Sequence, residues 1–172
     1  KKMKNISELI AQHKMGWTLD QKFYKSEEIF TIEVEKIFQD SWIFIGHQSQ
    51  IPEVGDYFVY TLLAEEVIIL RGKDDNIHAF YNVCRHRGSR ICLETSGSTK
   101  RLRCPYHSWT YNLEGNLKHI PEQEGFPGID PEQHGLVEVS AREKGGVVYV
   151  MQEGEITEDM LADCLDYFNP DQ

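Results

Sequence analysis

The spacing of apolar residues divides the chain into a helical start, a long strand-rich middle and a helical end. In SEEIFTIEVEKIFQD, apolar residues recur three and four positions apart, as on one face of a helix. Ser26 can cap this helix, and Glu27 and Glu28 suit the positive end of its dipole. The pattern predicts a helix over residues 26–40. Its apolar face would consist of Phe30, Val34, Ile37 and Phe38.

From Trp42 onward the apolar residues lie in short segments rich in β-branched and aromatic side chains, which is typical of strands. IPEVGD and GKDDN predict turns between them, and NLEGN predicts a hairpin connection. Three prolines and three glycines in residues 121–135 predict a long surface loop. The predicted strands are WIFIG, DYFVYTLL, EVIILRG, IHAFYNV, RLRC, WTYN, GNLKHI and one or two more within LVEVSAREKGGVVYVMQ.

The helical period returns in TEDMLADCLDYF and predicts a second helix over residues 157–168, with Thr157 as its cap. Its apolar stripe needs a partner that covers it. The stripe consists of Met160, Leu161, Cys164, Leu165 and Phe168. Together these patterns predict a mainly β, mostly antiparallel domain with a helix at each end.

Charge and composition narrow the functional class. The net charge of −10 argues against nucleic acid or an anionic membrane as partner. No apolar run approaches the roughly 18 residues of a membrane span, and the start lacks the features of a secretory signal. We therefore expect a cytoplasmic protein whose four cysteines are thiols or metal ligands rather than disulfides.

Two short stretches, CRHRG and CPYHSW, each contain one cysteine and one histidine. Cys84 and His86 form a C-x-H pair, and Cys104 and His107 form a C-x-x-H pair. Two Cys and two His could hold a tetrahedral zinc, although structural zinc sites usually pair like with like. A Rieske-type 2Fe-2S cluster explains the mixing better, because two Cys bind one iron and two His bind the other. We interpret the other two cysteines, Cys92 and Cys164, as core residues.

CRHRGSRIC followed by CPYHSWTYNLEGNL resembles the Rieske signature. With the leading helix and SWIFIGHQSQIPEVGDY, nearly the whole chain resembles the N-terminal domain of the large (α) subunit of Rieske non-heme iron oxygenases. These are ring-hydroxylating dioxygenases and quaternary-amine monooxygenases. The resemblance implies small antiparallel sheets with a cluster-binding subdomain. It also implies three segments: an N-terminal segment and helix (1–41), the Rieske domain (42–153) and a C-terminal helix or linker (154–172). The implied cluster ligands are Cys84, His86, Cys104 and His107.

Departures from the Rieske proteins of respiratory cytochrome bc complexes concern the surroundings of the cluster. Ser89 and Tyr106 stand where those proteins have a disulfide, and Trp109 stands where they have a serine that donates to a sulfide. Fewer donors disfavour the reduced state. We therefore expect a reduction potential near the low end of the Rieske range, roughly −150 mV. The Ser108 hydroxyl is a possible substitute donor.

Other residues receive weaker interpretations. Gly88 would let the backbone approach the cluster, and Pro105 would stiffen the second loop. Trp109 is either a lid or a core aromatic residue. Three arginines either offset the charge of the cluster, form a docking face or are simply solvated: Arg85, Arg87 and Arg90. The histidines without a partner at ligand spacing are read as structural or surface residues: His13, His47, His78, His119 and His134.

Oxygenases of this family also need a mononuclear Fe(II) held by two His and one carboxylate. In the family that iron lies in a larger C-terminal domain, and the sequence contains no H-x4-H with a distant Asp. The resemblance therefore implies the electron-transfer part of an oxidoreductase, from a fragment or a truncated gene product. An NAD(P)H-linked reductase or ferredoxin would supply electrons, which leave through His86 or His107. The acceptor iron would belong to a neighbouring subunit of a homo-oligomer, a trimer.

Two alternatives differ in class. A stand-alone Rieske ferredoxin would need neither the leading helix nor the long termini, and a zinc-stapled interaction module would hold zinc without sulfide. CPYHSWTY favours the quaternary-amine branch over aromatic hydrocarbon catabolism.

Overall fold

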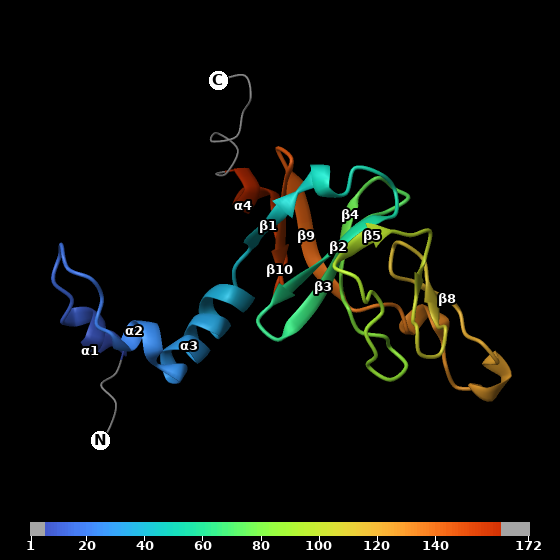
Figure 1. Ribbon diagram of the computed structural model, residues 1–172, viewed down its shortest axis with the longest axis horizontal. Helices are drawn as coiled ribbons and strands as arrows, with labels where there is room; N and C mark the ends of the chain where they lie inside the picture. The colour runs from blue at the N-terminus through green and yellow to red at the C-terminus, as the bar shows by residue number, and fades with distance from the viewer. Residues whose placement is uncertain (1–5, 163–172) are drawn as a thin grey trace.

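The computed structural model describes residues 6–162, which form a curled sheet with a smaller sheet at one end and helices at the other (Figure 1). Three residues of the apolar stripe predicted near the C-terminus therefore lie outside the described residues: Cys164, Leu165 and Phe168.

The N-terminal helices extend away from the sheet (Figure 1): α1 (Ile6–Ala11), α2 (Lys22–Lys25) and α3 (Glu27–Glu33), which continues as the π-helix η1 (Val34–Gln39). Ser26 Oγ accepts a hydrogen bond from Ile29 N at 3.4 Å, so the predicted cap is confirmed. The predicted apolar face is not buried, because Phe30 and Ile37 are 50% and 53% exposed. Ile29 is the buried residue of α3.

Seven antiparallel strands form the large sheet, in the order β1-β10-β9-β4-β3-β2-β5. Their bounds are β1 Ile43–His47, β2 Asp56–Leu62, β3 Glu65–Arg71, β4 Ile77–Tyr81, β5 Ser96–Ser98, β9 Glu138–Lys144 and β10 Val147–Met151. All except β5 match predicted strands. The apolar pattern misses β5 because SGS has no hydrophobic residue, and the strand forms by pairing Gly97 with Tyr57 of β2.

The small sheet has the order β6-β7-β8, with bounds β6 Leu102–Arg103, β7 Thr110–Tyr111 and β8 Leu117–His119. The predicted hairpin between β7 and β8 is present, and Gly115 has the positive φ of +81° that its turn requires. The predicted loop 121–135 contains two 3-10 turns, Gln123–Gly125 and Pro131–Gln133.

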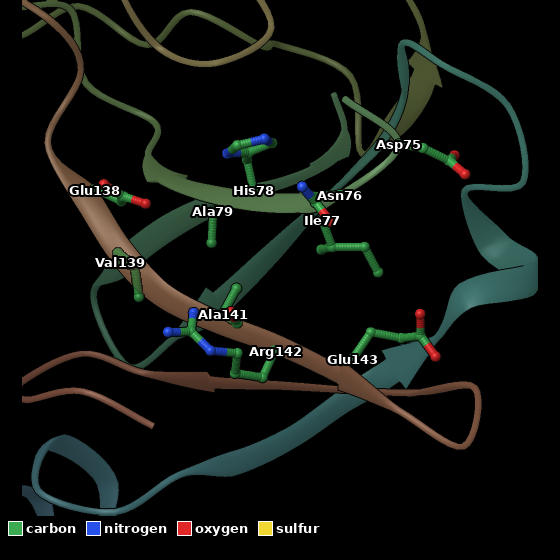
Figure 2. Close-up of a pocket in the computed structure, with 10 residues that line it drawn as sticks. All are labelled: Asp75, Asn76, Ile77, His78, Ala79, Glu138, Val139, Ala141, Arg142 and Glu143. Carbon is green, nitrogen blue, oxygen red and sulfur yellow. Dashed lines mark hydrogen bonds between the residues drawn. The ribbon is translucent and has the colours of Figure 1, made fainter. Parts of the chain in front are cut away.

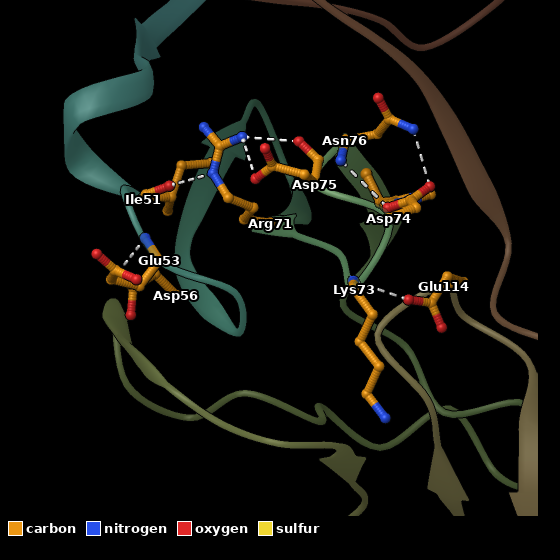
Figure 3. Close-up of polar contacts among 10 residues, drawn as sticks. Ile51, Glu53, Asp56, Arg71, Lys73, Asp74, Asp75, Asn76 and Glu114 are labelled. Atoms are coloured by element: carbon orange, nitrogen blue, oxygen red, sulfur yellow. Dashed lines mark hydrogen bonds and ion pairs between the residues drawn. The ribbon is translucent and has the colours of Figure 1, made fainter.

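The small sheet is fixed to the large one at the β3–β4 turn. Lys73 N donates to Glu114 Oε1 at 3.0 Å (Figure 3). Gly115 lies so close to the Phe80 ring that a Cβ would sit 2.4 Å from it. Buried residues of both sheets form one core cluster, including Ile68 and Leu70 of β3 with Tyr111 of β7. The small sheet is therefore rigidly seated.

The C-terminal helix α4 spans Glu158–Ala162, and Thr157 Oγ1 accepts from Met160 N at 3.4 Å, as the predicted cap requires. Leu161 is 1% exposed and packs in a cluster with Val147 and Tyr149 of β10. For the described part of the helix, β10 is therefore the partner that the apolar stripe needs.

Candidate metal centre

Two loops bring the four Cys and His side chains together. The first loop follows β4, where Cys84 N donates to Ser89 O (2.8 Å) and Cys84 O accepts from Gly88 N (2.9 Å). Gly88 has φ +71°, and a Cβ there would meet no atom of the chain within 4 Å. The glycine is therefore needed for its positive φ. No other part of the chain lies close enough to require the absence of a side chain at this position.

The second loop, between β6 and β7, repeats this hydrogen-bond pattern. Cys104 N donates to Trp109 O (2.9 Å), and Cys104 O accepts from Ser108 N (3.0 Å). Ser108, at the place of Gly88, also has a positive φ of +61°. Its Oγ accepts from Arg103 Nη2 at 2.9 Å, and this bond does not use the O–H that was considered as a substitute donor.

A buried asparagine anchors the first loop. Asn82 is 1% exposed, and its Oδ1 accepts from Ile91 N (3.0 Å) and Cys92 N (2.9 Å). Its Nδ2 donates to Cys92 O (2.8 Å) and to Glu66 Oε2 (3.0 Å). Arg90 pairs with the same Glu66, which lowers the pKa of that carboxyl. Arg90 thus helps to hold the loop through its ion pair with Glu66 and is not a free surface charge.

The four candidate ligands form a cysteine pair, in which Cys84 interacts with Cys104, and a histidine pair. Cys84 and Cys104 are both buried, and the rings of His86 and His107 lie 4.7 Å apart. Both histidine Nδ1 atoms are buried and have no hydrogen-bond partner. Buried polar atoms normally have a partner, so two buried nitrogens without one, on the loops that carry two buried thiols, fit the ligand set of a metal group. No three His, Cys, Asp or Glu side chains within residues 6–162 are grouped to hold one ion.

The electrostatics of the pairs fit metal ligation. Burial lowers the pKa of His86, and His107 and Arg87 add to the effect, which favours the neutral imidazole that binds metals. Burial raises the pKa of the Cys84 thiol, against the opposing effect of the Tyr111 hydroxyl. A thiolate at this position therefore needs a compensating cation, and a metal supplies one.

Aromatic residues enclose His86. Trp109 is 1% exposed and stacks on the imidazole with centroids 4.8 Å apart and planes 6° apart. It is thus a core residue that also packs directly on a candidate ligand. Phe126 meets the His86 ring edge-on at 5.6 Å, and Tyr106 lies 3.8 Å from the ring of His107. The sequence analysis missed Phe126, whose only signal is an aromatic residue in a polar, proline-rich loop.

Tyr111 is a second residue that the sequence analysis missed. Its side chain is fully buried, and Oη lies 3.4 Å from Cys84 Sγ. The same oxygen accepts from Arg85 N at 3.2 Å, and burial raises the pKa of the phenol. The hydroxyl therefore stays protonated and can donate to a Cys84 thiolate. The alternation in WTYN, which puts Tyr111 on the same side of the chain as Trp109 and opposite to Thr110, is the signal that could have found it.

Most of the remaining histidines have contacts of their own. His78 contacts Asp74 at 3.0 Å, His47 contacts Ser49 at 2.9 Å, and His134 contacts the Asp130 carbonyl at 2.7 Å. These contacts agree with a structural interpretation.

A hollow of about 410 Å³ lies between β4 and β9, away from the two Cys/His loops (Figure 2). It exists because these strands pair only at Ala79↔Val139 and Phe80↔Glu138, so the rest of the two edges splays apart. Its polar lining includes His78 and Arg142, and it contains none of the four candidate ligands.

Comparison with known proteins identifies the family of this domain. The family model for the Rieske [2Fe-2S] domain matches residues 41–140. The glycine betaine monooxygenase oxygenase subunit of Chromohalobacter salexigens is 36% identical over 166 residues, covering 95% of this chain and 37% of that protein. The biphenyl 2,3-dioxygenase α subunit of Rhodococcus jostii is 36% identical, covering 84% of this chain and 31% of that one.

A solved structure gives the same result for the fold. The structure of a quaternary ammonium Rieske monooxygenase with γ-butyrobetaine superposes with a TM-score of 0.82 at 32% identity, covering 95% of this chain and 47% of that one. The chain thus spans less than half the length of the relatives it matches, over their N-terminal part. No helix among residues 6–162 is long and apolar enough to cross a membrane. With its mainly β fold and its matched segment, this chain belongs to the Rieske [2Fe-2S] domain family, as found in oxygenase subunits.

Proposed function

We propose that Cys84 and Cys104 bind one iron of a 2Fe-2S cluster and that His86 and His107 bind the other through Nδ1. The observation that carries this assignment is the pair of buried, unpartnered Nδ1 atoms on the two loops that also carry two buried cysteines. The bound cluster supplies one-electron chemistry. Trp109 and Phe126 hold the ring of His86 in place, and Asn82 holds the first loop.

The chain's role would be to pass electrons within a Rieske oxygenase. An NAD(P)H-linked reductase or ferredoxin would reduce it, and a mononuclear iron in a separate catalytic domain would receive the electron. His86 and His107 are partly exposed, while their Nδ1 atoms are buried. Their exposed ring edges therefore suit the transfer of an electron out of the domain to the acceptor iron. In a trimeric assembly the acceptor would belong to a neighbouring subunit.

The substrate class that we favour is a quaternary amine. Glycine betaine and carnitine monooxygenase subunits recur among the similar proteins, at 35–36% identity for three of them. The biphenyl relative keeps aromatic rings as the competing class. We also propose a cytoplasmic location and the segment boundaries 1–41, 42–153 and 154–172.

The ligand assignment is tested by metal analysis of anaerobically purified protein. We expect iron and acid-labile sulfide in equal amounts and a Rieske-type EPR signal after dithionite. Cys104→Ser should abolish the signal, whereas Cys92→Ser, which alters a buried thiol outside the four ligands, should retain it. Zinc without sulfide would instead indicate a structural metal module and refute the assignment.

A further inference from the structure

The charge of the chain is divided unevenly. Residues 84–120 carry seven Lys or Arg and two Glu, whereas the other residues carry eleven Lys or Arg and twenty-six Asp or Glu. The positive segment contains both Cys/His loops and the small sheet, at the end of the molecule away from α1 to α3 (Figure 1). The chain of net charge −10 therefore has a positively charged segment around the two Cys/His loops, and the neighbouring loop 121–135 carries four acidic residues and no Lys or Arg.

Part of this end is a shaped surface on the outside of the small sheet. Register places Arg103 opposite Thr110, and Thr110 opposite His119. The alternate residues Leu102 and Tyr111 point into the core and are buried. We call the outward set the basic face, and with Pro121 it lines a hollow of about 230 Å³. Its members are Arg101, Arg103, Ser108, Thr110 and His119.

The two guanidinium groups of the basic face are available to a partner. Both arginines are exposed, and within residues 6–162 neither has a carboxylate partner. Arg103 donates only to the Ser108 hydroxyl, and the Arg101 side chain has no hydrogen bond within the same range. Arg90, by contrast, is neutralised by Glu66. Two guanidinium groups without a carboxylate partner, two positions apart at the start of β6, favour carboxylates, which they can bind in a bidentate manner.

The basic face is next to the second loop in the chain. Arg103 directly precedes Cys104, and Ser108 directly follows His107. A protein that docks here comes within one residue of two proposed cluster ligands. Electron transfer requires the donor to come close to the cluster ligands, whereas binding of a small anion does not. The position of the basic face therefore favours an electron donor as its partner.

We propose that the basic face docks a carboxylate-rich surface of the protein that reduces this domain. The inference rests on the proposed function and specifies its electron donor. An acidic donor would be repelled by the acidic surfaces of the chain and attracted to the unpaired arginines of the basic face, so the charge distribution orients the encounter. One electron passes from the donor's cluster to the oxidised cluster of this chain, and no bond forms or breaks.

The test uses the cluster-loaded chain and, as probe, an acidic plant-type [2Fe-2S] ferredoxin, whose potential of about −400 mV makes the transfer favourable. Stopped-flow absorbance gives the second-order rate of reduction, and calorimetry gives the affinity for the oxidised probe. Arg101→Glu and Arg101→Glu/Arg103→Glu are the test variants. The single variant guards against misfolding, because the side chain of Arg101 makes no hydrogen bond or ion pair with residues 6–162. Lys22→Glu/Lys25→Glu, in α2 at the other end, is the matched control with the same change in net charge.

At an ionic strength of about 0.02 M, we expect each test variant to lower the rate and the affinity, about tenfold or more for the double variant. The control should change them less than about twofold, and the differences should vanish near 0.5 M salt. The EPR signal should be the same in all variants.

An equal slowing in the control would overturn the proposal, since the effect would then follow net charge. An unchanged rate together with binding of inorganic phosphate at Arg101 would also overturn it, in favour of a small-anion site. If the wild-type chain has no Rieske EPR signal, the proposed function itself fails, which separates the two failures.

Discussion

The hydroxyl of Tyr111 should raise the reduction potential of the proposed cluster, and Tyr111→Phe should lower it. The hydroxyl lies 3.4 Å from Cys84 Sγ, inside a core where the ring is fully buried. Reduction adds negative charge to the ligand sulfurs, so a donor there stabilises the reduced state more than the oxidised state. Phenylalanine keeps the ring and removes only the donor.

The magnitude follows from the strength of such a bond. A hydrogen bond to a charged group contributes roughly 1.5–3 kcal/mol. The 3.4 Å separation is ordinary for a sulfur acceptor. If roughly half of that strength depends on the redox state, the difference is about 1 kcal/mol. One electron converts 1.4 kcal/mol into about 59 mV, so the expected shift is about −40 mV.

The assay is an EPR-monitored redox titration at pH 7, where burial keeps the phenol protonated by raising its pKa. Tyr106→Phe is the matched control, because its ring also lies beside a candidate ligand but is 62% exposed. The control should shift the potential by less than about 10 mV. A zero or positive shift in Tyr111→Phe, or an equal shift in both variants, would refute the reasoning. The expectation of a low potential, drawn from Ser89, Tyr106 and Trp109, took no account of this donor.

Three further substitutions test how the first Cys/His loop and the β3–β4 turn are stabilised. Gly88→Ala should lower the free energy of unfolding by about 1–2 kcal/mol in urea titrations, because φ is +71°. Gly125→Ala, equally free of neighbours but without a positive φ, should cost little by the same measurement. Asn82→Ala should cost about 3 kcal/mol, since it leaves two buried N–H groups without their acceptor; a loss below about 1 kcal/mol would contradict the anchoring role. Hydrogen bonding, first from Asn76, lowers the pKa of Asp74 to about 2 from 3.8. Stability from this carboxylate is complete above pH 3.8 and is lost as the pH falls toward 2, so melting curves of wild type and Asp74→Asn should converge there. The carboxyl is partly exposed, so its contribution is discounted to about 1 kcal/mol.

The sequence is informative wherever the determining interaction is local. The cap at Ser26 depends on a bond to a residue three positions away, and the hairpin before β8 depends on a glycine in its own turn. Strand period likewise follows from neighbours along the chain. The four candidate ligands lie in two short motifs whose spacing favours a Rieske cluster over zinc, and the family model matches the segment that contains them.

Only the tertiary structure decides features that depend on contacts between distant segments. β5 exists because β2 offers a free edge to an SGS segment without a pattern of its own. Tyr111 reaches Cys84 across 27 positions, and Phe126 meets the His86 ring from a loop 40 positions away. The basic face likewise requires β6, β7 and β8 to align, which turns scattered charges into one surface. Composition and spacing therefore determine the fold class and the chemistry that the chain can hold. Packing between segments far apart in the chain determines what surrounds that chemistry, because such contacts leave no periodic signal in the sequence.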